Sequence, residues 1–495
     1  MSEEMRAPES GATQTESCQI PQRVHLVGIA GIGMSAIARV LATWGHTVTG
    51  SDLSATPLTE ALNCLGIVTY VGHRAEQIGA ADWVVASSAI PSDNVELEAA
   101  RRRGIPVLKR QQLLGCMMTG DAAGAGRVGI GVAGTHGKTT TTAMIAVLLS
   151  EAGCDPTYIV GGVLHQTGSN ARAGHGPHFV VEADEYDRMF HGLRPRIAVL
   201  THMEMDHPDC FPTMDNLREA YRHYLRLVPP EGCIVACVDS PEVRKVLAML
   251  PAIGGPRVLT YGFSTDADYV VSGAEANAQG GADFAITVRG HGGGRFATRI
   301  PGLHNVLNAT AALIVAEQAG VEREVARDAL QRFEGVQRRF EVLGERSGVL
   351  VVDDYAHHPT HIRATLAGAR LRYPARRIVA VWQPHTYSRI RALWNEFANC
   401  FEQADEVLVT DVYVARASEV EPIAVSDLCA AVRHPRVRYS GSVDRTARAL
   451  PDMLHAGDLL LVLGAGDSVL IGGRVLAALE ARCGNPAVEE EQRGG

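Results

Sequence analysis

Residues 128–140 read Val-Gly-Ile-Gly-Val-Ala-Gly-Thr-His-Gly-Lys-Thr-Thr and decide the fold class. An apolar strand enters a glycine turn, and the turn leads into a helical stretch over residues 139–152. In such a phosphate loop the glycines let backbone N–H groups point at phosphate oxygens, and Lys138 and Thr139 would reach phosphate and Mg²⁺. Val132 stands where the full pattern has its first glycine. A glycine turn that binds nothing is the alternative.

Short β-branched runs alternate with helical stretches on both sides of this loop, which is typical of parallel sheets covered by helices. We therefore predict an α/β fold with three consecutive domains. The N-terminal domain (23–120) and the C-terminal domain (334–483) are expected to be Rossmann-like. The central domain (121–333) is expected to resemble P-loop ATPases, with a parallel sheet and an antiparallel addition over residues 268–299.

The segments between and beyond the domains are rich in polar residues or glycine. Residues 1–22 and 484–495 are predicted to be a disordered arm and a disordered tail. Residues 115–129 are rich in Gly and Ala and are predicted to be a linker. In the third domain, residues 390–401 are predicted to form one amphipathic helix.

Composition excludes several classes of protein. The 495 residues contain 46 Lys and Arg against 55 Asp and Glu, a net charge of −9, which argues against nucleic-acid or membrane partners. No apolar run reaches the roughly 20 residues of a membrane span, and the start of the chain lacks a secretory signal. We expect a cytoplasmic protein without an obligate protein partner. Its ten scattered cysteines are expected to be reduced thiols, and no zinc-like spacing accompanies them.

A second glycine turn follows the first predicted strand, at Gly28-Ile-Ala-Gly-Ile-Gly-Met-Ser35. Its spacing differs from the GxGxxG fingerprint because Ala30 takes the second glycine position, so it favours a diphosphate ligand rather than NAD. Asp52 ends the next strand, where a ribose-binding acid often lies, and Ser87 and Ser88 follow a later one. Ordinary turns and helix caps are the alternative for each of these residues. Two such turns predict two phosphorylated ligands.

Polar clusters also end two strands of the central domain. One contains Glu182, Asp184, Glu185 and Asp187, and the other contains His207. A carboxylate at a strand end beside a phosphate loop usually binds Mg²⁺, so Glu182 is a metal-ligand candidate. The acidic cluster could equally be a solvated face, and His207 could form hydrogen bonds instead of binding metal.

A third cluster, Asp353-Asp354-Tyr355-Ala-His357-His358-Pro359-Thr360, follows an apolar strand of the third domain. Such a strand-end pattern predicts a site rather than a core. One of the two aspartates could instead cap the helix that begins at Pro359.

These segments, together with Gly-Leu-His-Asn-Val-Leu-Asn-Ala (302–309), Arg-Arg-Phe-Glu (338–341) and Gln-Pro-His (383–385), resemble the Mur ligases of peptidoglycan synthesis. The resemblance covers about residues 23–482. It implies a first domain that binds a UDP sugar, a central domain that binds ATP and Mg²⁺, and a last domain that binds the incoming amino acid.

The resemblance also implies roles for individual residues. The candidates for catalysis are Lys138, Glu182 and His207, and those for metal binding are Thr139, Glu182 and His207. The candidates for ATP binding are Gly134, Thr135, His136, Gly137, Lys138, Thr139, Thr140, Asn305, Asn308, Arg339 and Asp354. The candidates for UDP-sugar binding are Gly28, Gly31, Ile32, Gly33, Met34, Ser35, Asp52, His73, Ser87 and Ser88. The candidates for amino-acid binding or domain closure are His357, His358 and His385.

Within the family, the first glycine loop is more similar to the branch that joins L-alanine to UDP-N-acetylmuramate through an acyl phosphate. The alternative is the branch that attaches a whole tripeptide to the same sugar. Two departures are evident: residues 216–227 lack the lysine that several sister ligases carbamylate, and Thr386 stands where relatives often have arginine. His207, His357 and His358 all qualify as general base. Two alternatives come from other classes of protein: an NAD-dependent oxidoreductase and a non-catalytic nucleotide sensor.

Overall fold

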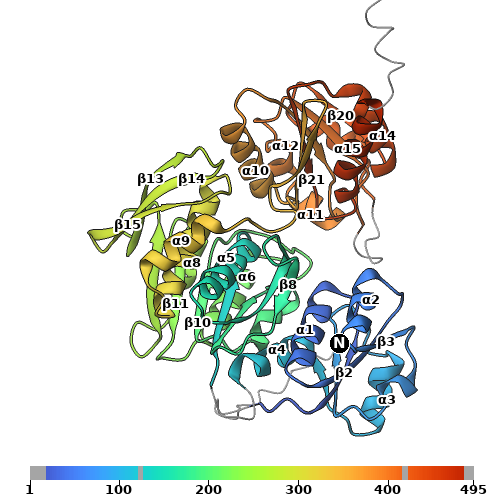
Figure 1. The fold of residues 1–495 in the computed structure, drawn as a ribbon, viewed down its shortest axis with the longest axis vertical. Coiled ribbons are helices and arrows are strands. Elements are labelled where there is room, and N and C mark those ends of the chain that lie inside the picture. Colours follow the sequence, from blue (N-terminus) through green and yellow to red (C-terminus); the bar gives the residue numbers. More distant parts are fainter. Residues whose placement is uncertain (1–17, 121–125, 415–421, 484–495) are drawn as a thin grey trace, which may run out of the picture.

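Three α/β domains follow one another along the chain, as predicted (Figure 1). The computed structural model describes residues 18–120, 126–414 and 422–483. Most of the predicted disordered arm and all of the predicted tail lie outside these ranges. Within them, no helix has the length and apolar character needed to cross a membrane.

The first domain is a five-stranded parallel sheet in the order β3-β2-β1-β4-β5. Because the strand order reverses between β1 and β4, the glycine turn after β1 lies at the switch point, where open α/β sheets bind ligands. The elements are β1 (Arg23–Val27), α1 (Ile32–Thr43), β2 (Thr47–Asp52), α2 (Pro57–Cys64), β3 (Val68–Val71), η1 (Ala75–Ile78), β4 (Trp83–Ala86), α3 (Val95–Arg102) and β5 (Val107–Lys109).

The predicted linker over residues 115–129 is wrong in its first part, because helix α4 (Arg110–Thr119) occupies it. Leu113, Met117 and Met118 are buried in a core that includes residues of both the first and the central domain, so apolar burial outweighs the low helix propensity of glycine. Gly115 serves close packing here, since a Cβ at this position would lie 2.2 Å from the carbonyl oxygen of Gly192. Residues 121–125 lie outside the described ranges.

The central domain is a ten-stranded sheet in the order β15-β14-β13-β12-β11-β10-β6-β9-β7-β8. Strand β6 lies in the middle and pairs in parallel with β9 and β10. The elements are β6 (Val128–Ala133), α5 (Lys138–Glu151), β7 (Thr157–Leu164), β8 (Ser169–Arg172), β9 (His178–Glu182), η2 (Tyr186–Gly192), β10 (Ile197–Leu200), α6 (Met214–Leu225), β11 (Cys233–Cys237), α7 (Pro241–Ala248), β12 (Arg257–Gly262), β13 (Tyr269–Ala276), β14 (Ala282–Val288), β15 (His291–Ala297), α8 (Leu303–Gln318) and α9 (Arg323–Arg332).

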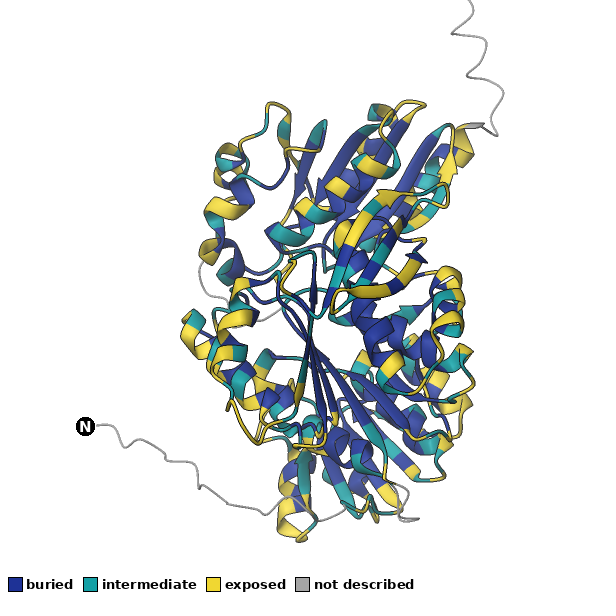
Figure 2. Ribbon diagram, turned by 90° about the vertical axis from the view of Figure 1, so that its left-hand side faces the viewer, coloured by how far each residue is buried: buried dark blue, intermediate teal, exposed yellow. Residues whose placement is uncertain are grey.

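The predicted antiparallel addition is present and has three strands instead of a two-stranded hairpin. Strands β13, β14 and β15 pair antiparallel, while β13 joins the main sheet through a parallel pairing with β12. Helix α5 packs against strands β6, β7 and β9 of the central sheet and against helices α8 and α9. Its residues 139–149 are all buried, and Figure 2 shows the buried strands running through the molecule. The phosphate loop is therefore fixed between a central strand and a buried helix.

The C-terminal domain is a six-stranded sheet in the order β16-β17-β21-β18-β19-β20, in which only β16 is antiparallel to its neighbour among the described strands. The elements are β16 (Glu341–Arg346), β17 (Val349–Asp354), α10 (Pro359–Arg372), β18 (Arg377–Trp382), α11 (Tyr387–Ala392), α12 (Trp394–Ala398), β19 (Glu406–Thr410), α13 (Val425–Ala431), β20 (Val437–Gly441), α14 (Val443–Met453), β21 (Asp458–Leu463) and α15 (Val469–Cys483).

One local prediction in this domain is wrong, and the alternative of an aspartate cap is excluded. The predicted helix over residues 390–401 is two short helices, α11 and α12, because Leu393 takes a non-helical conformation with φ −118° and ψ 29°. The N-cap of α10 is His358, whose ring nitrogen accepts a hydrogen bond from the Thr360 backbone N–H. Neither aspartate at the end of β17 caps this helix, and both remain available for other contacts.

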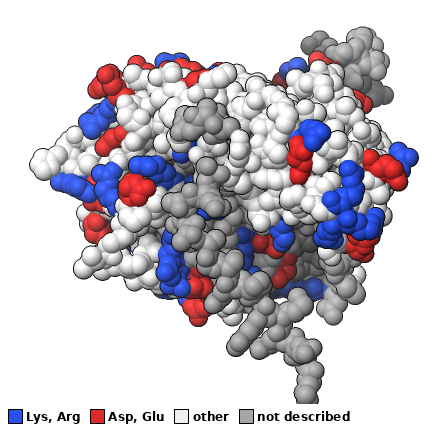
Figure 3. Space-filling view, turned by 90° about the horizontal axis from the view of Figure 1, so that it is seen from below, with Lys and Arg blue, Asp and Glu red and all other residues white. Residues whose placement is uncertain are grey.

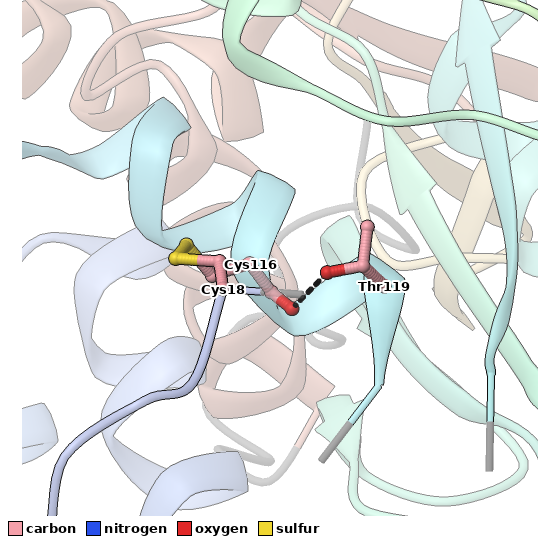
Figure 4. Close-up of a disulfide and its surroundings, with 3 residues drawn as sticks. All are labelled: Cys18, Cys116 and Thr119. Carbon is pink, nitrogen blue, oxygen red and sulfur yellow. Dashed lines mark hydrogen bonds between the residues drawn. A yellow bond between two sulfur atoms is a disulfide. The ribbon is translucent and has the colours of Figure 1, made fainter. Parts of the chain in front are cut away.

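The prediction that every cysteine is a reduced thiol is also wrong. Cys18 and Cys116 form a disulfide between the start of the described chain and helix α4 (Figure 4). The two residues are 98 positions apart, so sequence spacing gave no sign of the pairing. The segment after Cys18 packs on the first domain, where Gln22 Nε2 donates to the carbonyl oxygen of Gly45. The other cysteines with described side chains are free thiols.

Charged side chains of both signs are interspersed on the face seen from below (Figure 3). Exposed ion pairs are frequent elsewhere on the described chain, as between Arg23 and Asp82. Such surface pairs contribute little to stability, on the order of 0–1 kcal/mol each.

Candidate active site

A cavity of about 400 Å³ lies between the central and C-terminal domains. The phosphate loop, the ends of β9 and β10 and the start of α8 contribute lining residues from the central domain. Helix α10 and the loops after β17 and β18 contribute lining residues from the C-terminal domain. The carboxyl ends of parallel strands of two sheets thus face a common space, which is where open α/β sheets place their chemistry.

The phosphate loop takes a conformation that needs its glycines. Gly134 has φ +137° and Gly137 has φ +81°, and a Cβ at Gly137 would lie 2.4 Å from Asn308 Oδ1. The loop is held from the neighbouring strand end, because the Thr135 backbone N–H donates to the carbonyl oxygen of His202 over 2.6 Å. Backbone and packing therefore fix the loop before any ligand binds.

Lys138 forms a buried ion pair. Its Nζ lies 2.8 Å from Glu185 Oε2, and the two side chains are 13% and 2% exposed. Burial disfavours the charged lysine, but Glu185, Asp184 and Glu182 outweigh burial and raise its pKa. The alternative of a solvated acidic face is thus wrong for Glu185, and the lysine is held charged at the phosphate loop.

Thr139 and Glu182 meet at the end of β9. Thr139 Oγ1 donates to Glu182 Oε1 and Oε2 over 3.1 and 3.0 Å, and Arg339 Nη2 donates to the same hydroxyl over 3.3 Å. Burial raises the pKa of Glu182 against the opposing effects of Lys138 and Arg339. A hydroxyl and a carboxylate oxygen are donors that suit Mg²⁺, so these two predicted metal ligands are adjacent.

The other residues predicted to bind ATP line the same cavity, except Gly134, which is not among the lining residues. Asn305 Nδ2 donates to the carbonyl oxygen of Pro301 over 2.7 Å, and Asn308 Nδ2 donates to Asn305 Oδ1 over 3.1 Å. Asp354 is held between the Phe340 backbone N–H at 2.8 Å and His361 Nε2 at 3.1 Å. The lining also includes Gly137, Thr140, Arg339, Thr135 and His136.

His207 lies in the cavity lining beside a buried ion pair. Its Nε2 is 3.6 Å from Asp206 Oδ2, and Arg389 Nε donates to Asp206 Oδ1 over 2.9 Å. Burial opposes the charge on Asp206, but Arg389 and His207 outweigh burial and hold its pKa well below the usual range. Because Asp206 and Arg389 belong to different domains, this pair joins the two walls of the cavity.

The three predicted histidines of the C-terminal domain separate into two groups. His357 and His385 line the cavity, and His357 Nδ1 donates to the carbonyl oxygen of Tyr355 over 2.8 Å, which leaves its Nε2 as an acceptor in the neutral ring. His358 instead donates from Nε2 to the carbonyl oxygen of Met205 over 3.2 Å. Burial, with a smaller effect of His136, lowers the pKa of His358 to about 4.

Glu204 joins the phosphate loop to the C-terminal domain. Its carboxylate hydrogen-bonds His136 Nε2 and accepts from Thr360 Oγ1 over 2.9 Å, while its Oε1 lies 3.2 Å from His358 Nδ1. These partners, with the His136 hydrogen bond the largest, outweigh burial and lower the pKa of Glu204 to about 2. The residue is therefore ionised at neutral pH.

The first-domain candidates do not line this cavity. Gly28 has φ +85°, and a Cβ there would lie 2.9 Å from Ser87 Cβ, so the glycine turn packs directly against the turn after β4. Asp52 Oδ2 accepts from the Ala30 backbone N–H over 2.9 Å. Asp52 thus anchors the loop in this structure instead of pointing outward.

The remaining first-domain candidates differ in how far they are buried. The side chains of Met34 and Ser35 are buried, whereas Ile32 and Ser88 are exposed beside Gly31, Gly33 and Ser87. His73 Nδ1 lies 3.0 Å from Ser51 Oγ and 3.3 Å from Glu96 Oε2. Side-chain contact of Met34 and Ser35 with a ligand is excluded by their burial in this conformation.

Arg110 connects the first glycine loop to the acidic end of β9. Its Nη2 is 3.9 Å from Asp184 Oδ2, and a Cβ at Gly33 would lie 2.4 Å from its Nη1. Burial lowers the pKa of Arg110 despite Asp184 and Glu182, and its Nε is buried without a hydrogen-bond partner. This guanidinium thus links the first glycine turn to the acidic segment that follows β9.

Sequence reasoning missed several residues that the fold brings to the cavity or its edge: Arg110, Glu185 as the partner of Lys138, His202, Glu204, His304, His361 and Arg389. Five of them had a local signal. His202 and Glu204 lie in the same strand-end segment as His207, Glu185 belongs to the acidic cluster after β9, His304 lies in the 302–309 motif, and His361 follows His357 by four residues. Arg389 had none, because its partner Asp206 is 183 positions away.

Three family models match the chain in order. They are the Mur ligase family catalytic domain over residues 23–121, the Mur ligase middle domain over 132–316, and the Mur ligase glutamate ligase domain over 338–466.

Curated relatives match nearly the whole chain. A UDP-N-acetylmuramate–L-alanine ligase of Caldanaerobacter subterraneus is 41% identical over 457 residues, covering 92% of this chain and 97% of that protein. The protein of the same name from Solibacter usitatus is 43% identical over 463 residues, covering 93% and 96%.

Solved structures also match nearly the whole chain. The UDP-N-acetylmuramate–alanine ligase of Thermotoga maritima matches with a TM-score of 0.76 at 27% identity, covering 93% of this chain and 99% of that one. A murein peptide ligase of Psychrobacter arcticus matches with a TM-score of 0.66 at 27% identity and the same coverage.

Proposed function

The chain belongs to the Mur ligase family, and on that premise we propose that it joins L-alanine to the lactyl carboxylate of UDP-N-acetylmuramate with the cleavage of ATP to ADP and phosphate. One observation carries the proposal: the charged Lys138 and the Thr139–Glu182 pair share a cavity with histidines of the C-terminal domain. Phosphate activation and amine attack therefore have their residues in one place.

The family is ATP-dependent, and the phosphate loop supplies the groups that the nucleotide needs. The glycine loop leads into the N-terminus of α5, where Lys138 provides a positive charge, and Asn305 and Asn308 of α8 line the same cavity beside the loop. Arg339 and Asp354 reach this space from the third domain. We assign these residues, with Gly134, Thr135, His136, Gly137 and Thr140, to ATP.

Thr139 Oγ1 and the Glu182 carboxylate fit Mg²⁺, because both are oxygen donors and lie within 3.1 Å of each other at the edge of the cavity. His207 is our candidate for a second ion. Bound Mg²⁺ would supply charge neutralisation for the phosphates. Two hydrogen bonds orient the Glu182 carboxylate. One comes from Thr139 Oγ1 and the other from the Gly161 backbone N–H, which donates over 2.9 Å.

We assign the UDP sugar to the glycine turn of the first domain, with Gly28, Gly31, Ile32, Gly33, His73, Ser87 and Ser88 as its contacts, and Asp52, Met34 and Ser35 as supports of the loop. Its lactyl end must then reach the central cavity, and Arg110 lies on that path beside Gly33 and Asp184. A cationic group there stabilises an anionic substrate and the acyl phosphate formed from it.

The reaction has two steps. A lactyl carboxylate oxygen attacks the γ-phosphorus, the bond to the β-phosphate oxygen breaks, and ADP leaves. The amine nitrogen of L-alanine then attacks the acyl carbon, the bond to the phosphate oxygen breaks, and phosphate leaves while the nitrogen loses a proton. Of the histidines considered for that proton, His357 presents a free Nε2 to the cavity. We place the amino acid near His357 and His385, and the whole reaction in the cytoplasm.

Domain closure would shield the acyl phosphate from water. The contacts of Asp206 with Arg389 and of Glu204 with Thr360 already join the central and third domains in this structure. We assign His358, which contacts Glu204 and Met205, to closure. The three functional units correspond to residues 23–120, 121–333 and 334–483.

Phosphate release is the direct test. The purified protein is incubated with Mg-ATP and UDP-N-acetylmuramate, and L-alanine, L-serine, glycine or the tripeptide is added in turn. We expect release that requires the sugar nucleotide and is fastest with L-alanine. Release stimulated by the tripeptide and not by L-alanine would replace the proposal with the tripeptide-adding activity. Release that does not depend on the sugar nucleotide would refute both.

A further inference from the structure

Three metal-ligating side chains converge beside the phosphate loop. His136 and His202 face each other across an antiparallel β-bridge, and Glu204 lies two residues after His202, so its side chain points to the same face of the extended segment. One ligand atom from each of the three residues lies within 4.8 Å of the other two. The described residues contain one such group.

The three residues are held in place by the backbone and by their neighbours. The Thr135 backbone N–H donates to the His202 carbonyl oxygen over 2.6 Å, and Thr135 Oγ1 donates to the carbonyl oxygen of Glu204 over 3.0 Å. Thr360 Oγ1 donates to Glu204 Oε2 over 2.9 Å, which orients the carboxylate. Ligands that are already oriented lose little conformational freedom when an ion binds.

One polar atom of this group lacks a partner. His202 Nδ1 is buried without a hydrogen bond, and a buried nitrogen in that state costs free energy unless something satisfies it. The rings of His136 and His202 are 5.8 Å apart between centroids, so the two imidazoles flank a common space next to the Glu204 carboxylate.

We propose that His136, His202 and Glu204 form a binding site for a borderline divalent cation of the Zn²⁺ class. Two imidazoles and a carboxylate with a fourth position open are a zinc-type ligand set. Mg²⁺ prefers oxygen ligands and near-octahedral geometry, so this site is chemically distinct from the Thr139–Glu182 position. The inference rests on the geometry of the three side chains and does not depend on the proposed ligase reaction.

Co²⁺ is the probe, because it replaces Zn²⁺ with similar geometry and gives visible absorption that Zn²⁺ lacks. The full chain, free of nucleotide, is titrated with Co²⁺ in excess Mg²⁺ and followed by absorption and by calorimetry. We expect one Co²⁺ per chain, bound through nitrogen and oxygen without the charge-transfer band of a thiolate ligand. His202→Asn and Glu204→Gln should each weaken binding by at least about tenfold.

Two matched variants separate this site from others. His223→Asn disrupts the surface pair of His191 and His223, whose ring centroids are 4.2 Å apart, and should leave Co²⁺ binding unchanged. Glu182→Gln removes the proposed Mg²⁺ ligand and should also leave it unchanged. The proposal would be overturned if both His202→Asn and Glu204→Gln bound Co²⁺ as tightly as the unsubstituted protein. It would also be overturned if Glu182→Gln lost Co²⁺ binding or if excess Mg²⁺ displaced Co²⁺. Thermal unfolding of each variant identifies any that fail to fold.

Discussion

The buried ion pair of Lys138 and Glu185 makes a specific prediction for two substitutions. Lys138→Met alone removes the positive charge and leaves the Glu185 carboxylate, which is 2% exposed, without its cation. Lys138→Met with Glu185→Gln removes both charges and keeps similar side-chain volumes. The first change should therefore damage both stability and catalysis, whereas the second should damage catalysis alone.

The magnitude follows from burial. Removing one partner of a buried ion pair costs about 3–5 kcal/mol, while replacing both partners by neutral groups is near neutral. For a domain of this size, that cost lowers Tm by roughly 10 °C. Loss of a positioned charge at a transferring phosphoryl group should slow turnover by at least about a hundredfold. Because Lys138 lies in the central domain, binding of UDP-N-acetylmuramate to the first domain should change little.

Three measurements on each variant test this prediction: Tm by calorimetry, phosphate release with L-alanine, and the Kd for UDP-N-acetylmuramate. The expected pattern is low Tm and no turnover for Lys138→Met, and restored Tm without turnover for the double variant. A Tm shift of 2 °C corresponds to a loss of unfolding free energy on the order of 1 kcal/mol or less. If the Tm of Lys138→Met lay within 2 °C of that of the unsubstituted protein, the reasoning about burial would be refuted. Turnover restored in the double variant would refute the assignment of Lys138.

Three further predictions concern other parts of the site. Gly137→Ala places a Cβ at φ +81° and 2.4 Å from Asn308 Oδ1, and it should weaken ADP binding about fivefold or more because the loop takes on about 1–3 kcal/mol of strain; unchanged affinity in calorimetry would contradict it. Glu96→Gln removes the carboxylate that holds His73 and should weaken UDP-sugar binding about tenfold while ADP affinity stays constant, since hydrogen bonds to charged groups contribute about 1.5–3 kcal/mol. Glu204→Gln should lower stability by up to about 3 kcal/mol at pH 7, because the folded-state pKa of about 2 lies below the unfolded value. The stability difference between Glu204→Gln and the unsubstituted protein is present above about pH 4.5 and should shrink as pH falls toward 2. A stability difference that grows on acidification in thermal scans would contradict this prediction.

Much of the fold could be predicted because its signals are local. Strand β6, the glycine loop and helix α5 lie within 25 consecutive residues, and their apolar periodicity and turn residues identify them without knowledge of the rest. The failures occur where tertiary contacts decide. Gly115 indicated a linker, but it lies inside α4 at the closest approach to Gly192. The break between α11 and α12 at Leu393 is equally invisible in the apolar pattern.

The motifs of the site could be predicted from the sequence, but the contacts between its residues could not. Lys138 and Thr139 could be predicted from the glycine loop and Glu182 from its place at a strand end, because parallel topology brings these positions to one edge of the sheet. The contacts of Glu204 with His136 and Thr360 span 68 and 156 positions, and no local pattern encodes such distances. Asp52 had the residue type expected for ribose binding, yet its carboxylate binds the Ala30 backbone.

The central position of β6 has a consequence for how the protein is made. Its two neighbours, β9 and β10, end at residues 182 and 200, and the phosphate loop is held by backbone contacts from residue 202. A ribosome-bound chain that ends before this point cannot assemble the loop, although the first domain is already complete. During synthesis, the first domain should therefore fold first, and the phosphate loop should form only after the chain has emerged well beyond residue 202.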